Sequence, residues 1–341
     1  MKMHISGFFA CILLLCLFSK CKEQDSRNNN QLPVDTVLNN KPPVIKKEND
    51  CITTQQLLLH LTQDSITEKW PTRNRQVRSD ALLPHYRIIA YYGNFSSKKM
   101  GILGALPPDS MLQGLLTEVK KWSAADTLIP PLPALHLVSV IAQLDPGKDG
   151  KYRSRISYAQ IDKALLLARK IHGIVILDLQ LGWSSVSAEL PYLIHYLKLP
   201  DVHLAIDPEF SMYDTLIPGS AIGKISAVDI NHAIRYLSVL VQKYHVPPKL
   251  LILHSFRERM IANYKSIKLT PEVQVVMNMD AWGTSDAKIK TYNMIQSKCA
   301  VDFTGFKLFY KHDVRASYGK SIMQPLEILK LYPSPIYIQY Q

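Results

Sequence analysis

The chain has 341 residues, of which 47% are apolar and 20% are charged, so it can bury a globular core and is not disordered along its whole length. Lysine and arginine total 40 against 28 aspartate and glutamate residues, which gives a formal net charge of +12. This basic balance favours acidic surroundings such as anionic glycans, lipid headgroups or nucleic acid, and does not choose among them.

The N-terminus has the pattern of an export signal. An apolar run over residues 7–18 follows Lys2 and, at about 12 residues, is too short to cross a membrane as a helix. The run leads to Leu-Phe-Ser-Lys-Cys ending at Cys21, which resembles a bacterial lipoprotein box. We therefore expect a lipoprotein signal peptide over 1–20, a lipid on Cys21 and anchoring to the bacterial cell envelope, at the outer membrane or cell surface. Plain secretion and an uncleaved anchor are the alternatives.

Residues 21–50 have the composition of a disordered tether. They are polar, contain a run of asparagines at 28–30, and show no apolar periodicity that could bury a face. The folded domain is therefore expected over 51–341. Outside the signal and Cys21, the remaining cysteines are Cys51 and Cys299, so the sequence predicts no disulfide framework and leaves open whether these two pair.

Beyond the tether, short β-branched or aromatic runs alternate with longer amphipathic segments, which is typical of βα units. The strands that this pattern predicts are 87–92, 135–143, 173–180, 202–209, 249–256, 273–280, 303–310 and 335–340. The helices that it predicts between them are 111–124, 158–172, 187–196, 227–244, 257–266, 286–297 and 325–331.

This order of elements predicts an α/β fold, a (β/α)8 TIM barrel whose last strand lies at the C-terminus. The helix that normally follows the last strand is then missing, and we expect a helix over 53–62 to cover that gap from the N-terminal side. An open Rossmann-like sheet is the main alternative. It is disfavoured because no Gly-x-Gly-x-x-Gly follows the first strand and because the number of strands matches a closed barrel.

Polar residues at the strand ends are informative, because the chemistry of a TIM barrel lies at the C-terminal ends of its strands. Alternation places Asp178 and Gln180 on one face of the third strand, and Asp207 and Glu209 on one face of the fourth. The polar residues at other strand ends are Tyr91 or Tyr92, His254, Asn278, Asp280 and Lys307. Converging carboxylates repel one another and raise at least one pKa, as the general acid of glycoside cleavage requires.

Three motifs resemble those of the chitinase-like group of TIM-barrel glycoside hydrolases. They are Asp207-x-Glu209 ending the fourth strand, Met-Asn-Met-Asp-Ala-Trp-Gly over 277–283, and Gln-Leu-Gly-Trp over 180–183. The resemblance implies that Glu209 is the proton donor, that Asp207 orients the substrate or the acid, and that Asp280 assists. Asp178 is a further candidate partner carboxylate. The Asp-Pro-Glu run also looks like the Asp-x-Glu of secreted muramidases on a related barrel.

The expected substrate is a polysaccharide or envelope glycan, bound at the mouth of the barrel. Flat aromatic rings there can stack on sugars, although core packing is the alternative role for each ring. The substrate-binding residues that we expect are Tyr91, Gln180, Trp183, His254, Asn278, Trp282 and Lys307. No nucleic-acid motif accompanies the basic charge, so no nucleic acid is expected as a partner, and the membrane is reached through the N-terminal lipid.

The sequence thus predicts an envelope lipoprotein whose barrel cleaves a glycosidic bond by carboxylate acid/base chemistry, without a cofactor or metal. Two alternatives stay open. A catalytically inactive barrel that binds glycan or protein is favoured by Val202 and Ala205, which stand at two positions that are acidic in the chitinase-like group. A metal-dependent hydrolase is the other, with a divalent cation gathered by Asp178, Asp207, Glu209, His254 and Asp280.

Overall fold

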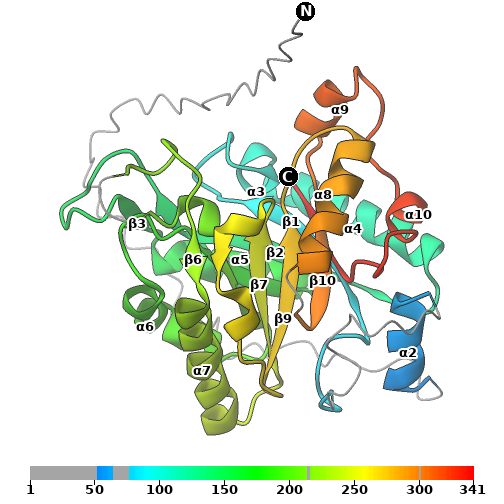
Figure 1. Cartoon of the computed structure of the whole chain (residues 1–341), viewed down its shortest axis with the longest axis horizontal. Helices are drawn as coiled ribbons and strands as arrows, with labels where there is room; N and C mark the ends of the chain where they lie inside the picture. Colours follow the sequence, from blue (N-terminus) through cyan, green and yellow to red (C-terminus); the bar gives the residue numbers. More distant parts are fainter. Residues whose placement is uncertain (1–51, 64–76, 213–215, 299–300) are drawn as a thin grey trace, which may run out of the picture.

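The structure, a computed structural model, describes residues 52–63, 77–212, 216–298 and 301–341. Its centre is a closed barrel of eight parallel strands, which confirms the predicted TIM barrel (Figure 1). In barrel order the strands are β1 (Arg87–Gly93), β2 (Pro131–Ala142), β4 (Ile174–Leu179), β5 (Val202–Ile206), β7 (Lys249–Ser255), β9 (Val273–Met279), β10 (Phe303–Leu308) and β11 (Tyr337–Tyr340). The parallel pairing of β11 with β1, in which Ile88 lies opposite Tyr337, closes the ring.

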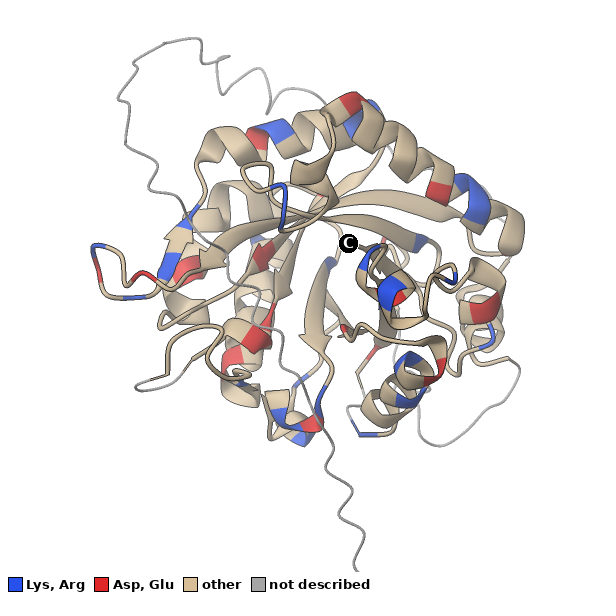
Figure 2. Ribbon diagram, turned by 90° about the horizontal axis from the view of Figure 1, so that it is seen from above, with Lys and Arg blue, Asp and Glu red and all other residues tan. Residues whose placement is uncertain are grey.

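Helices surround the strands, as the view along the barrel shows (Figure 2). The longer ones are α4 (Pro108–Ala125), α5 (Tyr158–Lys170), α6 (Val186–Leu197), α7 (Ala227–Tyr244) and α8 (Ser285–Lys298), and the short ones are α3 (Ile102–Ala105), α9 (His312–Ala316) and α10 (Pro325–Ile328). Their apolar faces pack on the outward side chains of the strands in one large core. No helix in the described part of the chain is long and apolar enough to cross a membrane.

The predicted helix over 257–266 is wrong. The segment forms two 3-10 turns, η3 (Glu258–Met260) and η4 (Tyr264–Ser266), on either side of the short strand β8 (Ile261–Ala262). β8 pairs in parallel with β6 (Ile225–Ser226), and Asn263 then adopts a left-handed conformation with φ of 56°, which ends any regular run. A separate short strand, β3 (Arg153–Arg155), pairs antiparallel with the end of β2.

A second core fills the inside of the barrel and explains the position of the first described helix. α2 (Thr54–Leu61) begins with a capping box between Thr53 and Gln56. Its buried Leu57 and Leu61 join the apolar side chains that point inward from the lower parts of the strands. α2 therefore covers the N-terminal end of the barrel, far from α9 (Figure 1). On the outside, α10 and α4 contact each other where the ring lacks its closing helix.

A buried ion pair joins these elements at the N-terminal end. The Arg87 guanidinium donates to Asp126 Oδ2 at 2.8 Å and to the Pro335 carbonyl at 2.7 Å, and it lies over the Trp122 ring. Asp126 also accepts the backbone N–H of Leu128 at 3.0 Å. The pair thus ties the start of β1 to the loop before β2 and to the segment before β11.

Replacing Asp126 by alanine should lower the free energy of unfolding by about 3–5 kcal/mol, because it leaves the fully buried Arg87 charge without its carboxylate partner. The matched control is Asp80→Ala, which removes an exposed pair with Arg78 and should change the free energy by about 0–1 kcal/mol. Urea unfolding followed by circular dichroism measures both. Equal losses in the two variants would show that the Arg87 pair is not buried.

Several predictions concern residues outside those described. The signal peptide over 1–20, the tether over 21–50 and the lipid on Cys21 all fall on such residues, as do Cys51 and Cys299, whose pairing the sequence left open.

Candidate active site

The upper layer of the barrel interior is polar, whereas the layers below it are mostly apolar, with the buried His203 as an exception. The strand register aligns this layer: Tyr92 lies opposite His136, His254 opposite Asn278, and Lys307 opposite Gln339. Asp178 lies next to the last residue of β4. Its side chain points inward, because its neighbours Leu177 and Leu179 pack outward against the helices. The alternation of each strand therefore brings one polar side chain from every side of the barrel to its mouth.

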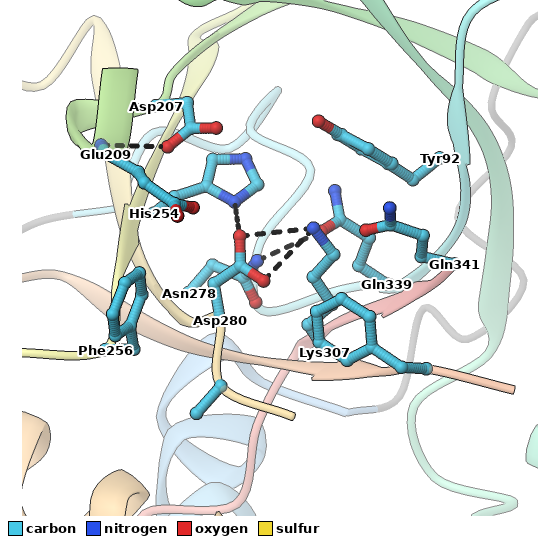
Figure 3. A network of polar contacts seen from close by, with 12 residues as sticks. Tyr92, Asp207, Glu209, His254, Phe256, Asn278, Asp280, Lys307, Gln339 and Gln341 are labelled. Carbon is cyan, nitrogen blue, oxygen red and sulfur yellow. Dashed lines mark hydrogen bonds and ion pairs between the residues drawn. The ribbon is translucent and has the colours of Figure 1, made fainter. Parts of the chain in front are cut away.

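Asp280 follows β9 and lies at the centre of this layer (Figure 3). The ammonium group of Lys307 is 3.1 Å from each of its carboxylate oxygens, and His254 Nδ1 is 2.8 Å from Oδ2. Burial alone would raise the pKa of Asp280, but the charges of Lys307 and His254 outweigh it and lower the pKa below its usual value. Asp280 is therefore held as a carboxylate.

Asp207 and Glu209 come from the segment that follows β5. Asp207 caps the 3-10 turn η2 (Pro208–Phe210), and its Oδ1 accepts the backbone N–H of Glu209 at 3.1 Å. The other oxygen accepts from Gln180 at 3.3 Å, so this side chain both caps the turn and faces the site. The cap holds Glu209 at the rim, where its side chain extends past His254 toward Asp280 (Figure 3).

The two rim carboxyls bind protons more tightly than ordinary carboxyls. Burial raises the pKa of Asp207 to about 6, with Asp178 and Asp280 adding to the shift. Burial also raises the pKa of Glu209 to about 8, and the neighbouring charges of Asp207 and Asp280 contribute to it. At neutral pH the site therefore holds a protonated Glu209 beside an ionised Asp280. Such a separation of two carboxyl pKa values is what assigns acid and base roles in known sites.

Below these groups, two histidines meet Asp178. His136 Nε2 is 3.1 Å from Asp178 Oδ2, and His254 Nε2 is 3.6 Å from the same oxygen. The ligand atoms of these three buried residues lie within 4.8 Å of one another, which is a geometry that can hold a metal ion. His136 was not among the site residues predicted from the sequence. Its place opposite Tyr92, between the outward Leu135 and Leu137, was the available signal.

Of the five residues considered for a cation, Asp178 and His254 belong to this group and the other three do not. Asp207 and Glu209 lie at the rim, and Asp280 contacts the far nitrogen of His254. The predicted acidic residues thus lie near one another at two depths of the barrel. Asp178 is in the deeper group, and Asp207, Glu209 and Asp280 are outside it.

Tyr91 does not join the site. It points outward and is 4% exposed in the core beneath α4, with its hydroxyl 3.3 Å from that of Tyr310. Its neighbour Tyr92 takes the inward position, because successive residues of a strand face opposite sides. The Tyr92 hydroxyl accepts from Gln180 at 3.3 Å, and the Lys307 ammonium lies 4.0 Å from the centre of its ring.

The remaining predicted binding residues lie in the layer or on the loops above it. Asn278 donates to Gln339 at 3.4 Å inside the barrel. Trp183, after β4, donates its indole N–H to the Leu216 carbonyl and packs on Tyr152 at 4.6 Å between ring centres. Trp282, after β9, is 53% exposed. Both indoles are thus on the side of the barrel where the strands end.

No protein-family model matches the chain, and no curated protein matches it. Among solved structures, the chain is similar to the mannanase BCman of Bacillus subtilis, with a TM-score of 0.36 and 12% identity over 76% of this chain and 81% of that one. It is also similar to GH26C from Muricauda sp., with a TM-score of 0.30 and 10% identity over 84% of this chain and 81% of that one. The parallel pairing of the eight strands by itself establishes the barrel fold.

Proposed function

We propose that the protein is a glycoside hydrolase in which Glu209 is the general acid and Asp280 is its partner carboxylate. The observation that supports this most directly is the pairing of a rim glutamate, whose pKa is raised to about 8, with an aspartate whose ionised form Lys307 and His254 stabilise. Glycosidic bond cleavage needs these two states of a carboxyl group in one site.

The chemistry follows from these two states. Glu209 donates its proton to the glycosidic oxygen, and the bond between that oxygen and the anomeric carbon breaks as the leaving sugar departs. Positive charge develops on the remaining sugar ring, and the Asp280 carboxylate stabilises it from the centre of the barrel. Water then bonds to the anomeric carbon and gives up a proton, which restores the protonated Glu209 and completes the hydrolysis. Asp207 positions Glu209 through the backbone N–H that it accepts, and Tyr92 and Gln180 offer polar groups to sugar hydroxyls.

The proposed substrate is a polysaccharide of the cell envelope or of the surroundings. The exposed ring of Trp282 and the half-buried ring of Trp183 lie above the site, where flat rings stack on the apolar faces of sugars. We further propose that the chain is exported and lipid-anchored through Cys21 to the bacterial envelope. The apolar run over 7–18 and the box ending at Cys21 support this proposal.

The test is turnover of a glycan panel by the wild type and by Glu209→Gln, with release of reducing ends as the measurement. The variant keeps the shape of the side chain and cannot donate the proton, so kcat should fall by about 10²–10⁴-fold while glycan binding persists. Glu258→Gln is the control, because Glu258 is an exposed glutamate paired with Lys298 on the outer surface. Equal turnover by the wild type and Glu209→Gln, or glycan binding by the wild type without turnover, would refute the proposal.

A further inference from the structure

The group formed by His136, Asp178 and His254 has features that the proposed glycoside chemistry does not use. The three side chains come from β2, β4 and β7 and are each fully buried, at 0% exposure. The Nε2 atoms of both histidines and both carboxylate oxygens of Asp178 have no hydrogen-bond partner among the described residues. Buried polar atoms are nearly always paired in folded proteins, so the meeting of three such atoms, the two Nε2 atoms and Asp178 Oδ2, indicates a place for a ligand.

The spacing of these atoms suits a metal ion. Asp178 Oδ2 is 3.1 Å from His136 Nε2 and 3.6 Å from His254 Nε2, although neither contact has the direction of a hydrogen bond. A tetrahedral Zn²⁺ with nitrogen and oxygen ligands at about 2.0–2.1 Å places neighbouring ligand atoms about 3.3 Å apart. The two separations lie on either side of that value.

The opposite ring nitrogen of His254 is held by a carboxylate, as in known metal sites, and that of His136 contacts a tyrosine hydroxyl. His254 Nδ1 is 2.8 Å from Asp280 Oδ2, and His136 Nδ1 is 2.7 Å from the Tyr337 hydroxyl. The Asp280 carboxylate keeps a proton on Nδ1 of His254, so a metal ion that binds at Nε2 takes the place of the second proton of the charged ring. Both rings are thereby oriented with Nε2 toward Asp178.

The charge of the barrel centre also favours a cation. Although the chain as a whole has a formal net charge of +12, the carboxyl groups of Asp178, Asp207 and Asp280 gather here around Lys307. Two imidazoles with one carboxylate match the ligands of Zn²⁺ and related transition metals, whereas Ca²⁺ and Mg²⁺ prefer oxygen ligands alone.

We propose that His136, Asp178 and His254 form a binding site for one divalent transition-metal ion of the Zn²⁺ class. The site lies beneath Glu209 and Asp280, and its existence does not depend on glycoside cleavage. It differs from the expectation of a barrel without a metal, and it includes His136, which was not among the residues predicted from the sequence.

The first experiment uses the wild-type full chain after treatment with a chelator. Titration with Co²⁺ should give saturable binding of one ion per chain, with the visible absorption of a low-symmetry site, and Zn²⁺ should displace it. In Cu²⁺-loaded protein, electron paramagnetic resonance should show coupling to the nitrogens of two imidazoles. Wild-type protein that binds no ion, or binds one without imidazole nitrogens, would overturn the proposal. That result is expected if a proton on His254 bridges Asp178 and Asp280 instead.

The second experiment compares three buried histidines changed to asparagine, which keeps a polar atom near Nδ1 and removes Nε2. His136→Asn and His254→Asn should each weaken Zn²⁺ binding by at least about 100-fold. His203→Asn is the control, because His203 is equally buried inside the barrel and accepts from the Leu250 N–H, but is not part of the group. Unchanged affinity in both test variants would overturn the proposal.

The two proposals fail separately. Glu209→Gln should bind Zn²⁺ as the wild type does, because Glu209 is outside the group of three ligands. Loss of glycan turnover in that variant with intact Zn²⁺ binding supports both proposals, and a chain that cleaves glycans but binds no metal refutes the metal site alone.

Discussion

Asp280→Asn should lower kcat by about 10³-fold or more on natural glycans and on aryl glycosides with an activated leaving group. The variant keeps the size of the side chain and removes the negative charge that faces the developing positive charge of the sugar. Both kinds of substrate develop this positive charge in the transition state, so kcat should fall for both. The amide also leaves Lys307, 3.1 Å away, with a positive charge that no longer has a carboxylate beside it.

Glu209→Gln should behave differently on the same two kinds of substrate. A leaving group that is already a good anion needs no proton, so the activated aryl glycoside should lose less than about tenfold while the glycan loses about 10²–10⁴-fold. The contrast between the two variants separates the acid from its partner, which neither variant does alone. Steady-state kcat and KM for both substrates are the measurements.

Asp286→Asn is the matched control for Asp280→Asn. Asp286 follows the same strand but is exposed in the first turn of α8, so its substitution should leave kcat within about twofold of the wild type. If Asp280→Asn keeps activity on the aryl glycoside and loses it on the glycan, Asp280 acts through proton transfer and the assignment of roles is reversed. If it keeps activity on both, Asp280 is outside the reaction.

Most of the architecture could be predicted because strand and helix periods are local properties. The period of 3.6 residues marked α7 over its full extent, and the β-branched runs marked every barrel strand to within a few residues. For the segment 257–266 the same periodicity wrongly predicted a helix, because its structure depends on the pairing of β8 with the distant β6. Tertiary contacts of that kind produce no periodic pattern in the local sequence.

The site was predictable where alternation could be counted from a strand end. Asp178, His254 and Lys307 all lie inward as expected. Tyr91 and Tyr92 were separable only by knowing which face of β1 is inward, and that is set by the pairing of β1 with β2 and β11. His136 lies in the middle of an apolar strand. A single histidine in such a strand is typical of a core residue, and its role becomes apparent only when its neighbours across the barrel are known.

The pKa values could not be obtained from sequence at all. The shift of Glu209 depends first on its burial and then on its nearness to Asp207 and Asp280, which come from segments about 70 residues apart in the chain. The Asp-x-Glu spacing indicated that two carboxyls would be close, but the partner that Lys307 and His254 hold ionised lies on another strand. The assignment of acid and partner is therefore a result of the closed barrel.

These pKa values predict the pH dependence of the reaction. Glu209 donates a proton, so it must be protonated, and a pKa of about 8 keeps it so through neutral pH. Above pH 8, kcat/KM for glycans should fall about tenfold per pH unit as the proton is lost. The activated aryl glycoside needs no proton and should not show this decline, so the two profiles should part near pH 8.

Asp207→Asn tests the cause of the raised pKa. Asparagine can still accept the Glu209 N–H through its side-chain oxygen, but it removes the neighbouring negative charge that disfavours ionisation of Glu209. The pKa of Glu209 should therefore fall, and the basic limb of the glycan profile should move to lower pH, by roughly one unit. Burial, which is the larger cause, remains, so the limb should stay above the ordinary pKa of a glutamate. A limb that does not move in Asp207→Asn, or that is shared by the aryl glycoside, would show that the group titrating near pH 8 is not the Glu209 acid.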